Sequence, residues 1–203
     1  MPQPPATIEQ LLGRAREGDR AAVDQILDLY RNYLYLLART QIDLQLARRL
    51  TPSDAVQETL LRAFKNFSRF RGATEGELVA WLRRILARSL ADQTRQARSL
   101  KRDVQREQAW QAGFDQSSQQ LAQLAVADQT SPSELASQRE RSVLLADALA
   151  RLPSDYREVI VLRHLERVEF AEIAQRLSRS PGAVRMLWAR ALERLRRELE
   201  HLE

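Results

Sequence analysis

Two arginines near the C-terminus have surroundings typical of residues that bind DNA. Arg185 and Arg190 follow Ser180 and Pro181, which favour the first turn of a helix. Ahead of them, residues 170–177 place apolar side chains on one helical face. Two helices joined by a short turn, with arginines on the face away from the core, are typical of a helix-turn-helix that enters the major groove. An ordinary helical hairpin with a solvated arginine face is the alternative.

The sequence holds few residues that could carry out catalysis. It has no glycine-rich phosphate loop, no paired carboxylates in an apolar setting and no motif of a serine or cysteine nucleophile. The absence of cysteine excludes a disulfide framework and cysteine-ligated zinc or iron–sulfur sites. His164 and His201 lack the spacing of metal ligands, and we expect both on the surface. We therefore expect no enzyme, no cofactor and no metal site.

The composition favours an all-α protein with an anionic partner. Among 203 residues, 44% are hydrophobic, only 6 are glycine and β-branched residues are sparse. The 32 basic residues outnumber the 27 acidic ones, and only Lys65 and Lys101 among them are lysines. Arginine binds phosphate and guanine through paired hydrogen bonds, although a GC-rich genome produces the same bias. Residues 1–5 do not resemble a signal peptide and no stretch reaches membrane-spanning length. We expect a cytoplasmic protein without membrane insertion.

The distribution of charge predicts two small helical domains, residues 1–98 and 139–203, joined by a flexible linker at 99–138. Basic residues are dense from Arg83 to Arg106. From 107 to 138 the sequence has no basic residue, four acids and eight glutamines. This acidic, glutamine-rich stretch is typical of a polar tether. We expect it to be extended, with a transient helix at residues 119–127.

Apolar periodicity predicts four helices in the N-terminal domain, at about 8–16, 21–41, 52–67 and 78–98. The third helix has Ser53 as its expected cap, and its polar side chains lie away from the apolar face. A loop with two glycines, residues 71–77, leads into the fourth helix. On that helix we expect Trp81 to face inward and the arginines to cluster outward.

Several strings in this order resemble the conserved regions of one protein family. Residues 54–64, 70–72, 80–85 and 91–92 look like region 2 of bacterial sigma factors. Residues 152–163, followed by the helix-turn-helix, look like region 4. The order, the spacing and the lack of a domain between the two resemble the extracytoplasmic-function (ECF) group. The resemblance implies a protein that binds core RNA polymerase and directs promoter recognition, melting and the initiation of transcription.

The resemblance also implies three sets of contact residues. Core polymerase would bind Asp54, Gln57, Glu58 and Arg62. Downstream promoter DNA would bind Arg71, Gly72, Thr74, Trp81, Arg83, Arg84 and Arg88, with the 71–77 loop capturing an extruded base. Upstream promoter DNA would bind Arg179, Ser180, Arg185, Met186, Ala189 and Arg190.

Some alternatives stay open at this point. Trp81 fits either a wedge at the melting fork or a core position. An anti-sigma protein is a third candidate partner, and the sequence alone does not tell whether one exists. A stand-alone helix-turn-helix regulator and a helical adaptor are the two other functions.

Overall fold

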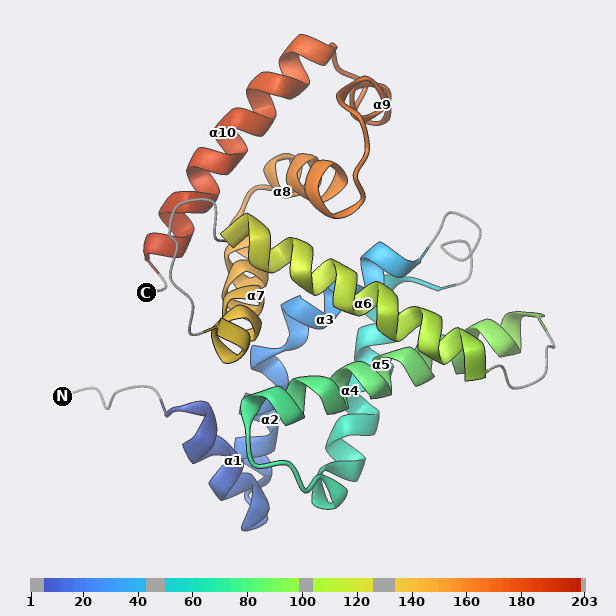
Figure 1. The fold of residues 1–203 in the computed structure, drawn as a ribbon, viewed down its shortest axis with the longest axis vertical. Coiled ribbons are helices and arrows are strands. Elements are labelled where there is room, and N and C mark those ends of the chain that lie inside the picture. The colour runs from blue at the N-terminus through green and yellow to red at the C-terminus, as the bar shows by residue number, and fades with distance from the viewer. Residues whose placement is uncertain (1–5, 43–49, 99–103, 126–133, 202–203) are drawn as a thin grey trace. The chain divides into compact units, whose positions relative to one another are not determined.

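The computed structural model is built from α-helices (Figure 1). It describes residues 6–42, 50–98, 104–125 and 134–201, and no strand occurs in these ranges. The elements in chain order are α1 (Ile8–Arg16), α2 (Arg20–Leu29), α3 (Arg31–Gln41), α4 (Pro52–Asn66), the 3-10 turn η1 (Phe67–Arg69), α5 (Glu75–Arg98), α6 (Val104–Ala125), α7 (Glu134–Arg151), α8 (Ser154–Ile160), the π-helical turn η2 (Val161–Leu165), α9 (Phe170–Arg176) and α10 (Pro181–Glu200).

The chain divides into two compact units, Met1–Asp115 and Gln116–Glu203. Each unit has its own buried apolar side chains, and the division falls inside α6. The prediction of an all-α fold with two domains is confirmed. Within the described ranges, no helix is both long and apolar enough to cross a membrane.

The prediction of an extended tether is wrong for the residues that form α6. Residues 105–125 contain no proline and no β-branched residue, and glutamine and alanine favour a helix. Phe114 and Leu121, seven positions apart on one face, are fully buried. Gly113 lets α6 approach α3 closely, because a Cβ there would overlap the side-chain amide of Gln41. The predicted linker also ends early, since α7 begins at Glu134; residues 99–103 and 126–133 lie outside the described residues.

The N-terminal unit begins with three helices, and the first two have side-chain caps at their N-termini. Thr7 and Gln10 form a capping box at the start of α1, and Gly18 ends the helix with a φ of 94°. The Asp19 carboxylate then caps α2 by accepting hydrogen bonds from two backbone N–H groups. One helix was expected at 21–41, but the structure has two, α2 and α3, with an interruption at Tyr30. Tyr30 is buried, and its hydroxyl donates a hydrogen bond to Glu75 at 2.8 Å.

Helix α4 packs against α2, α3 and α5 and forms the centre of the N-terminal unit. Its cap is Thr51, which accepts a hydrogen bond from the backbone N–H of Asp54, and Pro52 occupies the first turn. The expectation that Ser53 is the cap is therefore wrong. The buried side chains of α4 are Ala55, Val56, Thr59, Leu60 and Ala63, so its opposite side is left for another partner.

The C-terminal unit packs α10 against α7, α8 and α9. In Figure 1, α10 is the long red helix and α9 joins it through a short turn. Ile173 and Ala174 of α9 and Val184 and Leu187 of α10 are buried. Because these apolar residues recur at helical spacing, each helix keeps its remaining side for solvent or a ligand.

Candidate nucleic-acid interface

The turn between α9 and α10 has the geometry of a helix-turn-helix. Ser178 adopts a left-handed backbone with a φ of 52°, which lets the N–H of Arg179 donate to the carbonyl of Ala174 at 2.9 Å. The Ser180 hydroxyl then accepts a hydrogen bond from the N–H of Ala183 at 3.2 Å, and Pro181 begins α10. Serine does here what glycine often does, and the predicted turn is present.

The outer face of α10 carries the residues expected to contact upstream DNA. Arg185, Ala189 and Arg190 are exposed, and Met186 is 56% exposed. Within the described part of the chain, Arg185 and Arg190 have no hydrogen bond or ion pair. The exposed face of the helix thus presents two unpaired positive charges.

Four other arginines in and around the helix-turn-helix are paired with acids. Arg176 binds Glu172 at 2.6 Å, and Arg194 binds Glu198 at 2.8 Å. Arg197 binds Glu193, and Arg179, one of the residues expected at upstream DNA, binds Asp155. These ion pairs are exposed and individually weak. The nearby carboxylates nevertheless partly neutralise the charges of these arginines, whereas Arg185 and Arg190 bind no acid within the described residues.

One of the two histidines differs from the expectation of a surface position. His164 on η2 is half-buried and accepts a hydrogen bond from the indole N–H of Trp188 at 2.9 Å. The ring of Phe170 contacts Trp188 edge-on, with centroids 5.6 Å apart. Burial, followed by the positive charge of Arg163, holds the pKa of His164 below its ordinary value. His201 is exposed, as expected.

The 71–77 loop is folded onto the first turn of α5. The Glu77 carboxylate accepts hydrogen bonds from the N–H of Ala73 at 2.7 Å and from the N–H of Thr74 at 3.0 Å. The Thr74 hydroxyl in turn accepts from the N–H of Glu77, which completes a capping box. The backbone N–H of Ala73, and then that of Thr74, hold the pKa of Glu77 below its ordinary value. Helix α5 therefore starts at Glu75, three residues earlier than expected.

Gly72 in this loop has no room for a side chain. A Cβ at this position would overlap the ring of Phe70 and lie 2.8 Å from the Cβ of Glu77. Phe70, Phe67 and Trp81 form an aromatic cluster under the loop, with Phe70 and Trp81 centroids 5.1 Å apart. Trp81 is half-buried and packed in this cluster, so its ring supports the loop and keeps part of its surface accessible.

The arginines of α5 do not all point outward, and the prediction is wrong for Arg83. Its side chain is only 13% exposed; it donates to the Tyr33 hydroxyl at 2.7 Å and binds Asp115 at 2.8 Å. Arg84 and Arg88 are exposed. Arg84 makes one long hydrogen bond to the Ala80 carbonyl of its own helix, and Arg88 has no partner within the described residues.

The polar face of α4 is only partly free. Asp54 and Gln57 are exposed, whereas Glu58 and Arg62 bind each other at 2.6 Å. Arg62 also binds Asp92 of α5 at 2.7 Å and is 32% exposed. The predicted exposed position of Arg62 is thus half-buried, and this side chain joins two helices of the unit.

This face also carries a residue, Leu61, that was not expected from the sequence. Leu61 is 46% exposed, and it follows Gln57 by four positions and Glu58 by three, so the three share a face. Beside it, a groove of about 560 Å³ between α2 and α4 is lined by Leu27, Leu60, Leu61 and Phe64, together with Asp24, Asp28 and Arg31. The sequence feature that could have indicated this exposed leucine is the pair Leu60 and Leu61. Adjacent residues point to different sides of a helix, so only one of the two can lie on the buried side. No three acidic or histidine side chains within the described ranges could hold a metal ion.

Comparison with known proteins assigns both units. The model of Sigma-70 region 2 matches residues 24–100, and that of Sigma-70, region 4 matches residues 142–195. The two matches define a protein of the sigma-70 class. The RNA polymerase sigma-E factor of Streptomyces avermitilis is 34% identical over 169 residues, which cover 82% of this chain and 83% of that protein.

Two further relatives match almost end to end. The ECF RNA polymerase sigma factor SigW of Bacillus subtilis is 28% identical over 96% of this chain and 98% of its own. The ECF RNA polymerase sigma-E factor of Haemophilus influenzae is 29% identical over 97% of each chain. The chain belongs to the ECF group of RNA polymerase sigma factors.

Proposed function

We propose that this sigma factor binds core RNA polymerase through α4, captures melted downstream DNA at the 71–77 loop and reads upstream DNA with α10. The observation that carries the proposal is the selective pairing of arginines in the C-terminal unit. Arg185 and Arg190 are the arginines of the exposed α10 face that lack an acid partner in the described residues. Unpaired cations near the start of a recognition helix are available to phosphates and base edges.

The polymerase-binding surface would be the exposed face of α4. It combines the acid Asp54, the amide Gln57 and the apolar Leu61. An apolar anchor surrounded by polar groups is the composition of many protein interfaces. Arg62 acts differently in this proposal, because its pairs with Glu58 and Asp92 hold α4 in place.

The downstream DNA surface would be the folded 71–77 loop, which includes Arg71, together with Arg88 farther along α5. Exposed Arg71 and Arg88 supply positive charge, and Gly72 lets the loop backbone pack directly against the ring of Phe70 and the first turn of α5. Extrusion of a base costs a few kcal/mol that such contacts must offset. Arg83 contributes by fixing α5 against Tyr33 rather than by touching DNA.

The chain would work without chemistry of its own, as a non-catalytic subunit in the cytoplasm. An anti-sigma protein is a third partner in this proposal. It would act by covering either the α4 face or the α10 face, because both must be free for initiation.

Reconstitution with core polymerase tests the proposal. We expect the full chain and bacterial core enzyme to form a holoenzyme at micromolar concentrations and to transcribe selectively from a promoter library, while the free chain binds duplex promoters poorly. Core enzyme alone and core with the Leu61→Arg variant are the controls. Tight binding of duplex DNA by a dimer of the free chain, without holoenzyme formation, would instead identify a stand-alone regulator.

A further inference from the structure

Met186 brings a sulfur atom onto the exposed face of α10. The chain has no cysteine and two methionines, and the other methionine, Met1, lies outside the described residues. Met186 is 56% exposed, more than the two other large apolar side chains on the surface of the described ranges, Leu29 at 44% and Leu61 at 46%. In the described part of the chain, a reagent in water that attacks sulfur therefore has Met186 as its target.

The neighbours of Met186 on the helix leave its thioether uncovered. Gly182 and Ala183, one turn before it, and Ala189, three positions after it, are all exposed. A Cβ at Gly182 would have no heavy atom within 4 Å, so the space on that side is open. The fourth neighbour at this spacing is Arg190, a cation that has no hydrogen bond or ion pair within the described residues.

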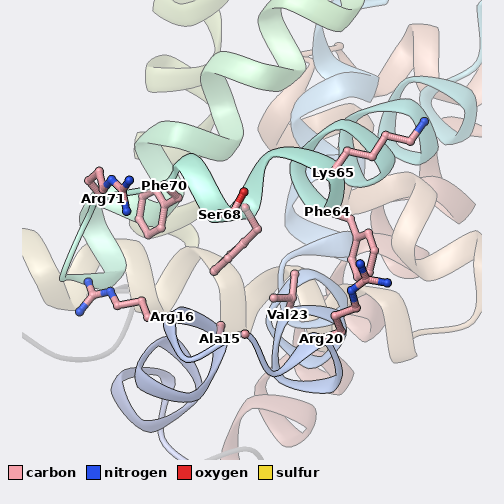
Figure 2. Close-up of a pocket in the computed structure, with 11 residues that line it drawn as sticks. Ala15, Arg16, Arg20, Val23, Phe64, Lys65, Ser68, Phe70 and Arg71 are labelled. Atoms are coloured by element: carbon pink, nitrogen blue, oxygen red, sulfur yellow. The ribbon is translucent and has the colours of Figure 1, made fainter.

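The N-terminal unit offers no target for the same reagent between residues 2 and 115, where the sequence has neither methionine nor cysteine. Its pocket of about 600 Å³ among α1, α2, the end of α4 and η1 is lined by cationic, aromatic and small side chains, and Figure 2 shows no sulfur atom among them. The α4 face and the 71–77 loop hold no sulfur either. Oxidation of sulfur in the described ranges therefore leaves the polymerase-binding and downstream surfaces of the proposed function unchanged.

We propose that Met186 is an oxidation site through which hydrogen peroxide reversibly weakens upstream promoter recognition. The sulfur lone pair attacks one peroxide oxygen, an S–O bond forms, the O–O bond breaks and one water is released. The thioether thus loses two electrons and becomes a sulfoxide. A methionine sulfoxide reductase reverses the step with two electrons from a pair of thiols, and the oxygen leaves as water. The inference rests on the proposed function, because it concerns the α10 face that would read upstream DNA.

The sulfoxide changes this face in two ways. An apolar tip that can contact the methyl group of thymine becomes polar. The new sulfoxide oxygen is also a hydrogen-bond acceptor four positions before Arg190, within reach of its guanidinium on the same helix face. A guanidinium that donates to the sulfoxide is less available to base edges. The fold is retained, because Met186 is exposed whereas Val184 and Leu187 carry the packing of this turn.

Treatment of the full chain before assembly tests the inference. The factor is incubated with hydrogen peroxide, the excess is removed with catalase, and untreated core enzyme is then added. Peptide mass spectrometry locates the added oxygen, and promoter-library transcription measures upstream preference. We expect one oxygen on Met186, normal holoenzyme formation and a loss of preference of about fivefold or more at one upstream base pair, the discrimination of one arginine–guanine contact. Methionine sulfoxide reductase with dithiothreitol should restore the preference.

Two variants, each compared with its own untreated sample, are the controls. Met186→Leu keeps an apolar side chain without sulfur, so peroxide should leave its preference as it was. Adding Leu29→Met to Met186→Leu moves the thioether to an exposed position on α2 that belongs to none of the three contact sets. Mass spectrometry should detect oxidation at this position, while upstream preference stays the same.

Three results would overturn the inference. They are an unchanged preference in fully oxidised wild type, an equal loss in treated Met186→Leu, and a loss that the reductase does not restore. Failure of the untreated wild-type chain to form a holoenzyme or to prefer any upstream sequence would instead refute the proposed function.

Discussion

The indole N–H of Trp188 on α10 donates to Nε2 of His164 on η2, with 2.9 Å between the two nitrogens. The two rings also stack, with an interplanar angle of 17°. This contact joins the recognition helix to the segment before the helix-turn-helix. It requires an unprotonated His164 nitrogen, because a protonated imidazolium has no acceptor to offer.

The contact makes the stability of the C-terminal unit dependent on pH. The pKa of His164 is lower in the folded chain than the value of about 6.5 expected when it is unfolded. As the pH is lowered, His164 therefore takes up a proton more readily in the unfolded state than in the folded state. The contribution of His164 to the free energy of unfolding is fully present above about pH 6.5 and decreases as the pH falls below this value. Urea unfolding followed by Trp fluorescence at several pH values measures this. His164→Gln, which retains a side-chain oxygen as acceptor, should remove this part of the pH dependence; an unchanged slope would contradict the assignment.

Removal of the ion pair between Arg62 and Asp92 should lower the stability of the N-terminal unit, although the exposed residues of the α4 face stay unchanged. Asp92→Ala leaves the half-buried guanidinium of Arg62 with Glu58 as its remaining acid. We expect the free energy of unfolding to decrease by about 1.5–3 kcal/mol, the range for hydrogen bonds to charged groups. Gln57→Ala on the same helix is exposed and should change it by less than about 0.5 kcal/mol. Chemical denaturation of both variants distinguishes the two positions.

Leu61→Ala should weaken polymerase binding more than it weakens the fold. The side chain is 46% exposed, so its removal creates no cavity. Its neighbour Leu60 is 8% exposed, and Leu60→Ala should cost about 2–5 kcal/mol of stability. Thermal unfolding and a titration of each labelled variant with core enzyme give the two quantities. Normal polymerase affinity in Leu61→Ala would exclude this residue from the interface.

Arg185 and Arg190 should determine upstream sequence preference. A bidentate contact between arginine and guanine contributes about 1–3 kcal/mol of discrimination, so Arg185→Ala should flatten the preference at one upstream base pair. Arg194→Ala is the control, because Arg194 binds Glu198 in the structure. Promoter-library transcription with each holoenzyme at two salt concentrations measures the preference. If both Arg185→Ala and Arg190→Ala keep the wild-type preference, a different face of α10 reads the DNA.

Local patterns were sufficient to predict the helix-turn-helix and most helices, because apolar spacing and caps act within a few residues. Charge composition was misleading for α6, where helix propensity and two buried side chains, Phe114 and Leu121, outweigh the lack of basic residues. The inward position of Arg83 could not be predicted locally. It depends on Tyr33 and Asp115, which are 50 and 32 residues away in the sequence.

The hydrogen bonds that Glu77 accepts from Ala73 and Thr74 order the 71–77 loop before any ligand arrives. A loop that is already folded loses little conformational entropy on binding. Under the proposed function, the slow event in initiation is then the spontaneous opening of base pairs, and the loop only traps what the duplex releases. Lag times before the first transcript should therefore follow how easily each promoter melts, while the protein contributes nearly the same waiting time at all of them.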